Sequence, residues 1–273
     1  MKYLSAQWKC VYLVAVTSND SSAVPADVVG RAIRLLVLVG EHAHGSTLSV
    51  LARESGVPVS TAHRLLNTLR REGLVEFEPD GKRYKPGLRL FQLGQQAGQA
   101  YGFAGTALPV MQRVTRQTEE ATLMSVLDGT RHLYVHYVDG PLPVGVRSEP
   151  GRHGPLHCTA MGKVLMAFAP DEVRADLLDR VELTPHGPNS ITDRDVLRAE
   201  VARAADLGYA TVDQEHHAGL RAVAVPILRP DGSLFGALST AAPAFRRGVD
   251  DLVALVPLLR SAAAELGVRL PAR

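Results

Sequence analysis

The feature that most constrains the fold is an amphipathic segment, residues 59–72, that leads directly into a hairpin pattern. At 100° per residue, its apolar side chains fall on one stripe and its polar side chains on the opposite stripe. The pattern predicts a helix that buries one side and leaves a hydrogen-bonding side free. The buried stripe is Ala62, Leu65, Leu66 and Leu69, and the free stripe is Ser60, Arg64, Asn67 and Arg71, flanked by His63 and Thr68.

Two shorter helical patterns precede this segment. Residues 28–39 repeat apolar side chains at three- and four-residue steps, which is typical of an amphipathic helix. After a loop over 42–46, Thr47 is suited to cap a second helix. Gly56 ends that helix because glycine tolerates the left-handed conformation, and Pro58 suits the first turn of the third helix. The order predicts a helix-turn-helix.

The hairpin pattern covers residues 74–85. Apolar and acidic side chains alternate up to Glu78, the turn is Pro79-Asp80-Gly81-Lys82, and Arg83-Tyr84-Lys85 return. A hairpin directly after such a helix is a wing, and its positive tip suits a phosphate backbone. Arginine can bond guanine with two hydrogen bonds, and asparagine can bond adenine in the same way. We therefore expect double-stranded DNA to be contacted by Ser60, Thr61, His63, Arg64, Asn67, Arg71, Lys82 and Arg83.

The bulk composition is compatible with this prediction. The chain has 273 residues, 46% of them hydrophobic and 21% charged, which is globular rather than disordered composition. Residues 25–95 hold 10 Lys/Arg and 7 Asp/Glu, a net +3, whereas residues 104–273 hold 18 and 20, a net −2. The asymmetry is small, but its sign allows the first part to bind nucleic acid. No apolar run is long enough to cross a bilayer, so we expect no membrane partner.

The start of the chain and the cysteines bear on location. Lys2 and Lys9 precede a short apolar stretch that loosely resembles a secretory signal. Residues 1–24 are better interpreted as a flexible extension, or as the result of a start codon placed too early. The two cysteines, Cys10 and Cys158, are too few for a disulfide framework and suit a reducing cytosol. Neither belongs to a Cys-x-x-Cys pair, so a structural zinc site has no support from spacing. We expect a cytoplasmic protein without a cofactor.

The second half of the chain alternates helical and strand patterns. Strand pairs are predicted at 121–138 and 222–240, a long helix starts from a capping box of Thr192 and Asp195, and Gly267 stops a final helix. No phosphate-binding glycine loop or nucleophile elbow occurs. The fold class is α/β (α+β), with a largely antiparallel sheet in the second domain. The predicted division is an extension at 1–24, a winged helix-turn-helix at 25–86, a linker helix at 87–104 and a second domain at 105–270.

Several spaced motifs in this order resemble the IclR family of regulators. They include Ser60-Thr61-Ala62-His63-Arg64, His157-Cys158-Thr159-Ala160-Met161-Gly162-Lys163, Asp213-Gln214-Glu215 and Gly219-Leu220-Arg221. The resemblance implies a GAF-like effector-binding domain, a dimer or tetramer, and operators that are inverted repeats. It also implies a transcriptional regulator, of a family with both repressors and activators, controlled by a small organic effector. The effector contacts that it implies are Ala160, Met161, Gly162, Asp213, Leu220, Ala222 and Ser239.

Some positions depart from the relatives that bind very small carboxylates. Val212, Ala222 and Ala241 stand where those relatives have Asp, Cys and Ser, and Met161 is bulky and apolar. Fewer polar anchors favour a larger or more apolar ligand. The sequence around Asp213 also resembles that of members that control aromatic-acid breakdown. An aromatic or other organic acid of a catabolic pathway is therefore the expected effector.

Histidines and a cysteine of the second half raise two other functions. A nucleophile–base–orienter set of Cys158, His157 and Asp213 would make an enzyme, but adjacent residues point apart, so His157 is poorly placed to activate Cys158. A metal sensor would use His216-His217, or His132 and His136, which share a face on a regular strand. We expect neither catalysis nor a metal site.

Overall fold

The computed structural model describes residues 27–42, 44–100 and 105–270. These residues form two compact units; the first ends at Ala100, and the second contains the described residues from 105 onward. The predicted extension 1–24 and part of the predicted linker lie outside the described residues. Within the described ranges, no helix is both long and apolar enough to span a bilayer.

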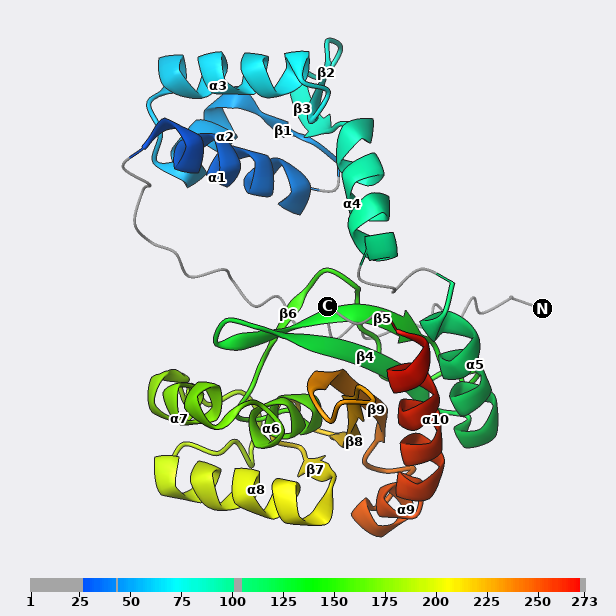
Figure 1. Cartoon of the computed structure of the whole chain (residues 1–273). Helices are drawn as coiled ribbons and strands as arrows, with labels where there is room; N and C mark the ends of the chain where they lie inside the picture. Colours follow the sequence, from blue (N-terminus) through cyan, green and yellow to red (C-terminus); the bar gives the residue numbers. More distant parts are fainter. Residues whose placement is uncertain (1–26, 43, 101–104, 271–273) are drawn as a thin grey trace, which may run out of the picture. The chain divides into compact units, whose positions relative to one another are not determined.

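The first unit contains the three predicted helices and the predicted hairpin (Figure 1). Its core is made by the buried stripe of the third helix packed against Leu35 and Leu51, both 0% exposed. The elements are α1 (Val28–Glu41), α2 (Leu48–Ser55), α3 (Val59–Arg71), β2 (Val75–Glu78), β3 (Arg83–Pro86) and α4 (Leu88–Ala100).

Most of the residues predicted to begin or end helices in this unit lie at or next to helix ends in the structure. Gly56 takes the left-handed conformation, with φ of 68°, after the last residue of α2. Pro58 sits at the cap of α3, one residue before the first turn where it was predicted. Thr47 precedes α2 but makes no capping hydrogen bond, because Ser46–Thr47 form a strand, β1, that pairs antiparallel with β3. The predicted loop thus contributes a third strand to the wing.

The second unit is built on one six-stranded antiparallel sheet, which confirms the predicted sheet type. The strand order is β6-β5-β4-β9-β8-β7, so the two edges are the short strands β6 and β7. The strands are β4 (Ala121–Asp128), β5 (Arg131–Val138), β6 (His153–Pro155), β7 (Ala210–Asp213), β8 (Leu220–Leu228) and β9 (Leu234–Pro243). The helices are α5 (Ala107–Thr118), α6 (Ala160–Ala167), α7 (Asp171–Arg180), α8 (Arg194–Leu207), α9 (Val249–Val253) and α10 (Val256–Arg269).

The sheet separates two apolar cores, because alternate residues of each strand face opposite sides. Ala237 and Ala241 of β9 pack with α6, α7 and α8, whereas Leu238 and Ala242 pack with α5 and α10. Figure 1 shows the same two groups of helices on opposite sides of the sheet. We call the side covered by α6 the α6 face; it includes Leu123, Ser125, Ala222, Ala237 and Ala241.

Three predictions for this unit need correction. The long helix α8 is capped by Asp193, whose carboxylate accepts from the backbone N–H groups of Asp195 and Val196, and not by Thr192. Helix α7 was not predicted. The region predicted as one final helix forms two helices, α9 and α10. Helix α10 continues through Gly267 instead of ending before it. A Cβ at Gly267 would lie 1.9 Å from the carbonyl oxygen of Leu228, so this glycine serves close helix–strand packing.

We expect Gly267→Ala to destabilise the second unit by about 1–3 kcal/mol, because the methyl group overpacks the contact between α10 and β8. The matched control is Gly94→Ala in α4, where an added Cβ meets nothing within 4 Å. The control should stabilise the first unit by about 0.5–1 kcal/mol through helix propensity alone. Chemical denaturation followed by circular dichroism measures both shifts. Equal stabilisation by the two substitutions would contradict the close contact.

Candidate functional site

The free stripe of α3 is the first candidate surface. Ser60, His63, Arg64 and Arg71 are exposed, while Thr61 and Asn67 are half-buried. The amide nitrogen of Asn67 lies 3.1 Å from Nε2 of His63, one turn away. The guanidinium of Arg71 donates to the hydroxyl of Thr68 at 3.3 Å. Among the described residues, the Ser60 and Arg64 side chains make no hydrogen bond or ion pair, so both remain available to a partner.

The wing tip carries the other two predicted contacts. Lys82 and Arg83 are both exposed. The guanidinium of Arg83 donates to the carbonyl oxygen of His44 at 3.2 Å, which fixes one side of the wing to the loop before β1. Lys82 takes a positive φ of 48°, a conformation that costs a non-glycine residue about 1–3 kcal/mol. The strained residue is therefore also an exposed positive charge of the turn.

The start of α6 holds three of the predicted effector contacts. Ala160, Met161 and Gly162 form its first turn, and the Thr159 hydroxyl caps it by accepting from the N–H of Gly162 at 3.0 Å. A Cβ on Gly162 would lie 2.3 Å from the carbonyl oxygen of Leu156. Only glycine therefore lets the turn approach the preceding loop this closely. As a result, Met161 is directed against the sheet, where it is 4% exposed.

Ala222, Ser239 and Leu220 lie on the α6 face with Met161, by strand alternation. The Ser239 hydroxyl donates to the carbonyl oxygen of Val223 at 2.8 Å, so backbone satisfies it. Ser125, on the neighbouring strand β4, is 0% exposed and donates to the Met161 sulfur at 3.2 Å. A thioether is a weak acceptor, so this buried hydroxyl has a poor partner.

Asp213 is not brought to this face. Val212 pairs with Ala222 across β7 and β8, and Asp213 pairs with Arg221, so Val212 and Asp213 point to opposite sides of the sheet. The Asp213 carboxylate lies 2.7 Å from the Arg221 guanidinium, which lowers the pKa of Asp213 below its usual value. Asp213 instead lines a separate open cleft of about 410 Å³ with Lys163, Glu200 and Arg203.

The residues that sequence reasoning missed on the α6 face come mainly from β4 and β5. Ser125 and Tyr134 are register partners, as are Leu123 and Tyr137, and both tyrosines pack against the core there. The alternation of β4 could have indicated Ser125. A bulge in the pairing of β4 and β5 puts Tyr134 and Tyr137 on the same face although they are three residues apart. The two-residue period of a regular strand therefore could not predict this.

The same bulge corrects one alternative. Tyr134 pairs with Ser125 but His136 pairs with Met124, so His132 and His136 face opposite sides of the sheet. His132 is buried beside the Thr159 hydroxyl at 3.1 Å, and burial lowers its pKa to about 3. These two histidines therefore do not form the pair that a regular strand would give.

The nucleophile set is not assembled either. His157 Nε2 lies 3.0 Å from the carbonyl oxygen of Thr184, and the Asp213 carboxylate is bonded to Arg221 and Gln214. Burial raises the pKa of the Cys158 thiol to about 12, the opposite of what an activated nucleophile needs. Asp213 therefore does not orient His157.

The family is decided by matches that cover most of the chain. Residues 28–79 match the IclR helix-turn-helix domain, and residues 96–268 match the domain described as bacterial transcriptional regulator IclR C-terminal. The chain belongs to the IclR family of transcriptional regulators. The predicted fold class is thereby confirmed for this IclR-family regulator: an N-terminal winged helix-turn-helix and a C-terminal effector-type domain with an antiparallel sheet.

Individual relatives match over nearly their whole length. The "Probable transcriptional regulator SauR" of Cupriavidus necator is 30% identical over 249 residues, 91% of this chain and 97% of the relative. XynR, an HTH-type transcriptional regulator of Escherichia coli, is 30% identical over 211 residues, 77% of this chain and 84% of the relative. The crystal structure of an IclR homologue from Microbacterium hydrocarbonoxydans, complexed with 4-hydroxybenzoate, has a TM-score of 0.78 and 29% identity, covering 88% of this chain and 98% of that one.

We expect Lys82→Gly in this IclR-family regulator to separate stability from DNA binding. Glycine relieves the left-handed strain at position 82, so the first unit should gain about 0.4–1 kcal/mol. Loss of one phosphate contact should lower the slope of log K against log salt by about 1 on non-specific duplex DNA. Thermal denaturation and salt-dependent fluorescence anisotropy measure the two effects. Arg152→Gln, a matched charge loss in the second unit, should leave the slope unchanged, and an unchanged slope for Lys82→Gly would exclude the wing from the DNA contact.

Proposed function

We propose that this regulator reads its operator with the free stripe of α3 and holds the phosphate backbone with its wing. The observation that carries this proposal is the pairing of an exposed, uncommitted Arg64 with Asn67 one turn further along α3. Side chains at this spacing suit neighbouring base edges in the major groove. Ser60, Thr61, His63 and Arg71 are proposed to complete the contact surface from the same helix.

The regulator is proposed to act as a homodimer or a tetramer of two dimers on an inverted repeat. Support comes from a stripe on α1, where Val29, Ile33 and Val37 are 67%, 56% and 44% exposed at successive four-residue steps. Leu88 and Phe91 of α4 are also exposed, at 74% and 65%. Apolar stripes of this kind in one small domain are suited to pack on a second copy.

Replacing Arg64 should reveal base readout. We expect Arg64→Ala to lose about 1–3 kcal/mol of operator affinity and to relax the base preference at one position of each half-site. The operator is the duplex that the wild-type chain selects from a random-sequence pool, and sedimentation of the complex should give two chains per repeat. Arg53→Ala in α2 is the control. Unchanged affinity and preference in Arg64→Ala would mean that another element reads the bases.

The effector is proposed to be an aromatic or other organic acid that binds on the α6 face. The face is largely apolar, with only small side chains at Ala222 and Ala241, and Ser125 offers a hydroxyl with only a weak partner. Met161 fills the space next to Ser125, and its flexible side chain can turn aside for a ligand. A related IclR homologue is complexed with 4-hydroxybenzoate, which has this chemistry.

Effector binding is proposed to change the spacing of the two DNA-binding domains in the dimer. A ligand that binds one arrangement more tightly shifts the population toward it, and operator affinity changes by the same coupling free energy. The sign of the change, repression or activation, is set by the arrangement that the operator prefers. The chain acts in this scheme by binding and not by catalysis, in the cytoplasm where bacterial DNA lies.

A ligand screen tests the effector proposal. We expect 4-hydroxybenzoate or a close aromatic acid to raise the melting temperature of the second unit more than glyoxylate or pyruvate does. Ser125→Ala should weaken the aromatic acid by about 0.5–1.5 kcal/mol, the worth of one hydrogen bond. Ser233→Ala, in the exposed turn between β8 and β9, is the matched control. Stabilisation by the small keto acids alone would contradict an apolar effector site.

A further inference from the structure

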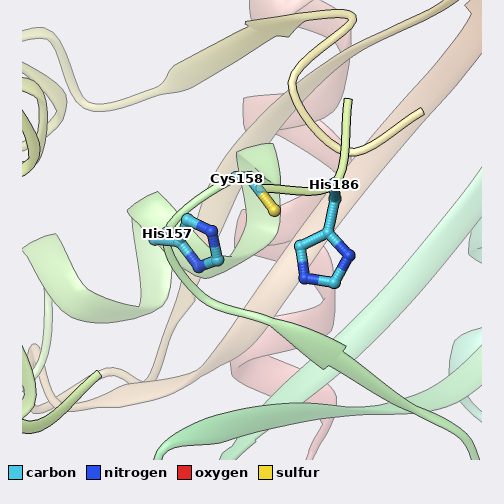
Figure 2. Close-up of side chains that lie close together, drawn as sticks. All are labelled: His157, Cys158 and His186. Atoms are coloured by element: carbon cyan, nitrogen blue, oxygen red, sulfur yellow. The ribbon is translucent and has the colours of Figure 1, made fainter. Parts of the chain in front are cut away.

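Three side chains of the metal-ligating type meet beside the start of α6, and a fourth lies next to one of them. His157 and Cys158 directly precede that helix, His186 lies between α7 and α8, and His216 follows β7. One ligand atom each from His157, Cys158 and His186 lie within 4.8 Å of one another. Figure 2 shows the Cys158 sulfur between the two imidazole rings. The ring centre of His216 is 5.2 Å from that of His186.

The hydrogen bond made by one His157 nitrogen leaves the other nitrogen available to a metal ion. Nε2 lies 3.0 Å from the carbonyl oxygen of Thr184, so Nε2 carries the proton that this hydrogen bond needs. Nδ1 is then a bare lone pair, and it is buried without a hydrogen-bond partner among the described residues. Ligating histidines in metal sites are typically held in this way by a backbone carbonyl on the far nitrogen.

The loop of His186 is held against the segment of His216. The Ser190 hydroxyl accepts from the N–H of His186 at 2.8 Å and donates to the carbonyl oxygen of Glu215 at 2.5 Å. Gly187 lies so close that a Cβ there would be 2.3 Å from the carbonyl oxygen of Gln214. The backbone of both histidines is therefore in place without help from an ion.

We propose that His157, Cys158 and His186, with His216 as the fourth donor, bind a divalent transition-metal ion of the zinc class. His216 qualifies because its Nε2 is buried and has no partner among the described residues. Zinc bonds of about 2.0–2.3 Å in a tetrahedral site place ligand atoms roughly 3.5 Å apart. The ligand atoms of His157, Cys158 and His186 therefore need only small side-chain rotations, while His216 must turn toward them.

The donor chemistry selects the ion. Imidazole and thiolate suit Zn²⁺, Co²⁺ and their neighbours, whereas Mg²⁺ and Ca²⁺ prefer oxygen. Binding replaces the thiol proton: the S–H bond of Cys158 breaks, a sulfur–metal bond forms, and the proton leaves to solvent.

One side of the cluster opens to solvent. His186 is exposed and provides the entry side, while Cys158 is fully buried. Nearby, the carboxylates of Glu200 and Glu215 are balanced by Lys163 and Arg203, so these four groups add no net charge. An ion here would join the loop before α6 to the loops before α8 and β8. The site uses none of the residues proposed to contact the operator or the effector, and it departs from the expectation of a metal-free chain.

Cobalt substitution tests the site on the full chain without a histidine tag, DNA or effector. The protein is stripped with a chelator under reducing conditions and titrated with Co²⁺. We expect one equivalent to give a thiolate-to-cobalt charge-transfer band with the visible absorption of a tetrahedral site, and Zn²⁺ to abolish both. Absence of the charge-transfer band at one equivalent overturns the proposal.

Variants assign the ligands. Cys158→Ser should lose the charge-transfer band, whereas Cys10→Ser, which removes the other thiol, should keep it. His186→Ala changes an exposed residue, so the variant should fold. We expect it to weaken Co²⁺ binding at least about tenfold, because even loss of a residue that only hydrogen-bonds a metal ligand typically costs that much affinity. His153→Ala, a surface histidine paired with Asp128, is its control. A band that depends on Cys10, or unchanged affinity in His186→Ala, would place the ion elsewhere and overturn the assignment.

Discussion

The buried ammonium group of Lys163 holds together the side of the second unit that is covered by α6 and α8. Its side chain is 1% exposed, and Nζ lies 2.7 Å from the Glu215 carboxylate and 3.2 Å from that of Glu200. A buried charge that loses one partner costs about 3–5 kcal/mol, so α6, α8 and the segment after β7 must keep their mutual positions. The start of α6 carries Met161, and the segment after β7 carries His216. Both the α6 face and the histidine–cysteine cluster therefore depend on this ion network.

Much of the first unit could be predicted because its information is local. The stripe that includes Leu65 and Leu66 repeats with the helical period, and both residues are buried as that period requires. Gly56 ends α2 in the left-handed conformation that its residue type favours. The hairpin around Lys82 was found because alternation and turn residues occur together. In the second unit, long strands such as β8 and β9 were predicted for the same reason.

The rest depends on contacts between segments far apart in the sequence. Ser46–Thr47 form a strand only because β3 lies beside them. Gly267 looks like a helix stop until the carbonyl group of Leu228 is seen against it. The bulge in β5 reverses the side on which His136 lies, and no residue type in that strand announces it. His157 and His186 are 29 positions apart in the sequence, so only the folded chain brings them together.

The two edges of the six-stranded sheet have a consequence for how copies of the chain meet. The edge strands, β6 (His153–Pro155) and β7 (Ala210–Asp213), span three and four residues, and the first ends in a proline, which has no N–H to donate. Short edges of this kind give another backbone little to pair with, which discourages continuous sheets between molecules. Growth without limit, as in a fibre, is thereby disfavoured. Association is left to side-chain surfaces, whose shape can fix both the number of subunits and their symmetry.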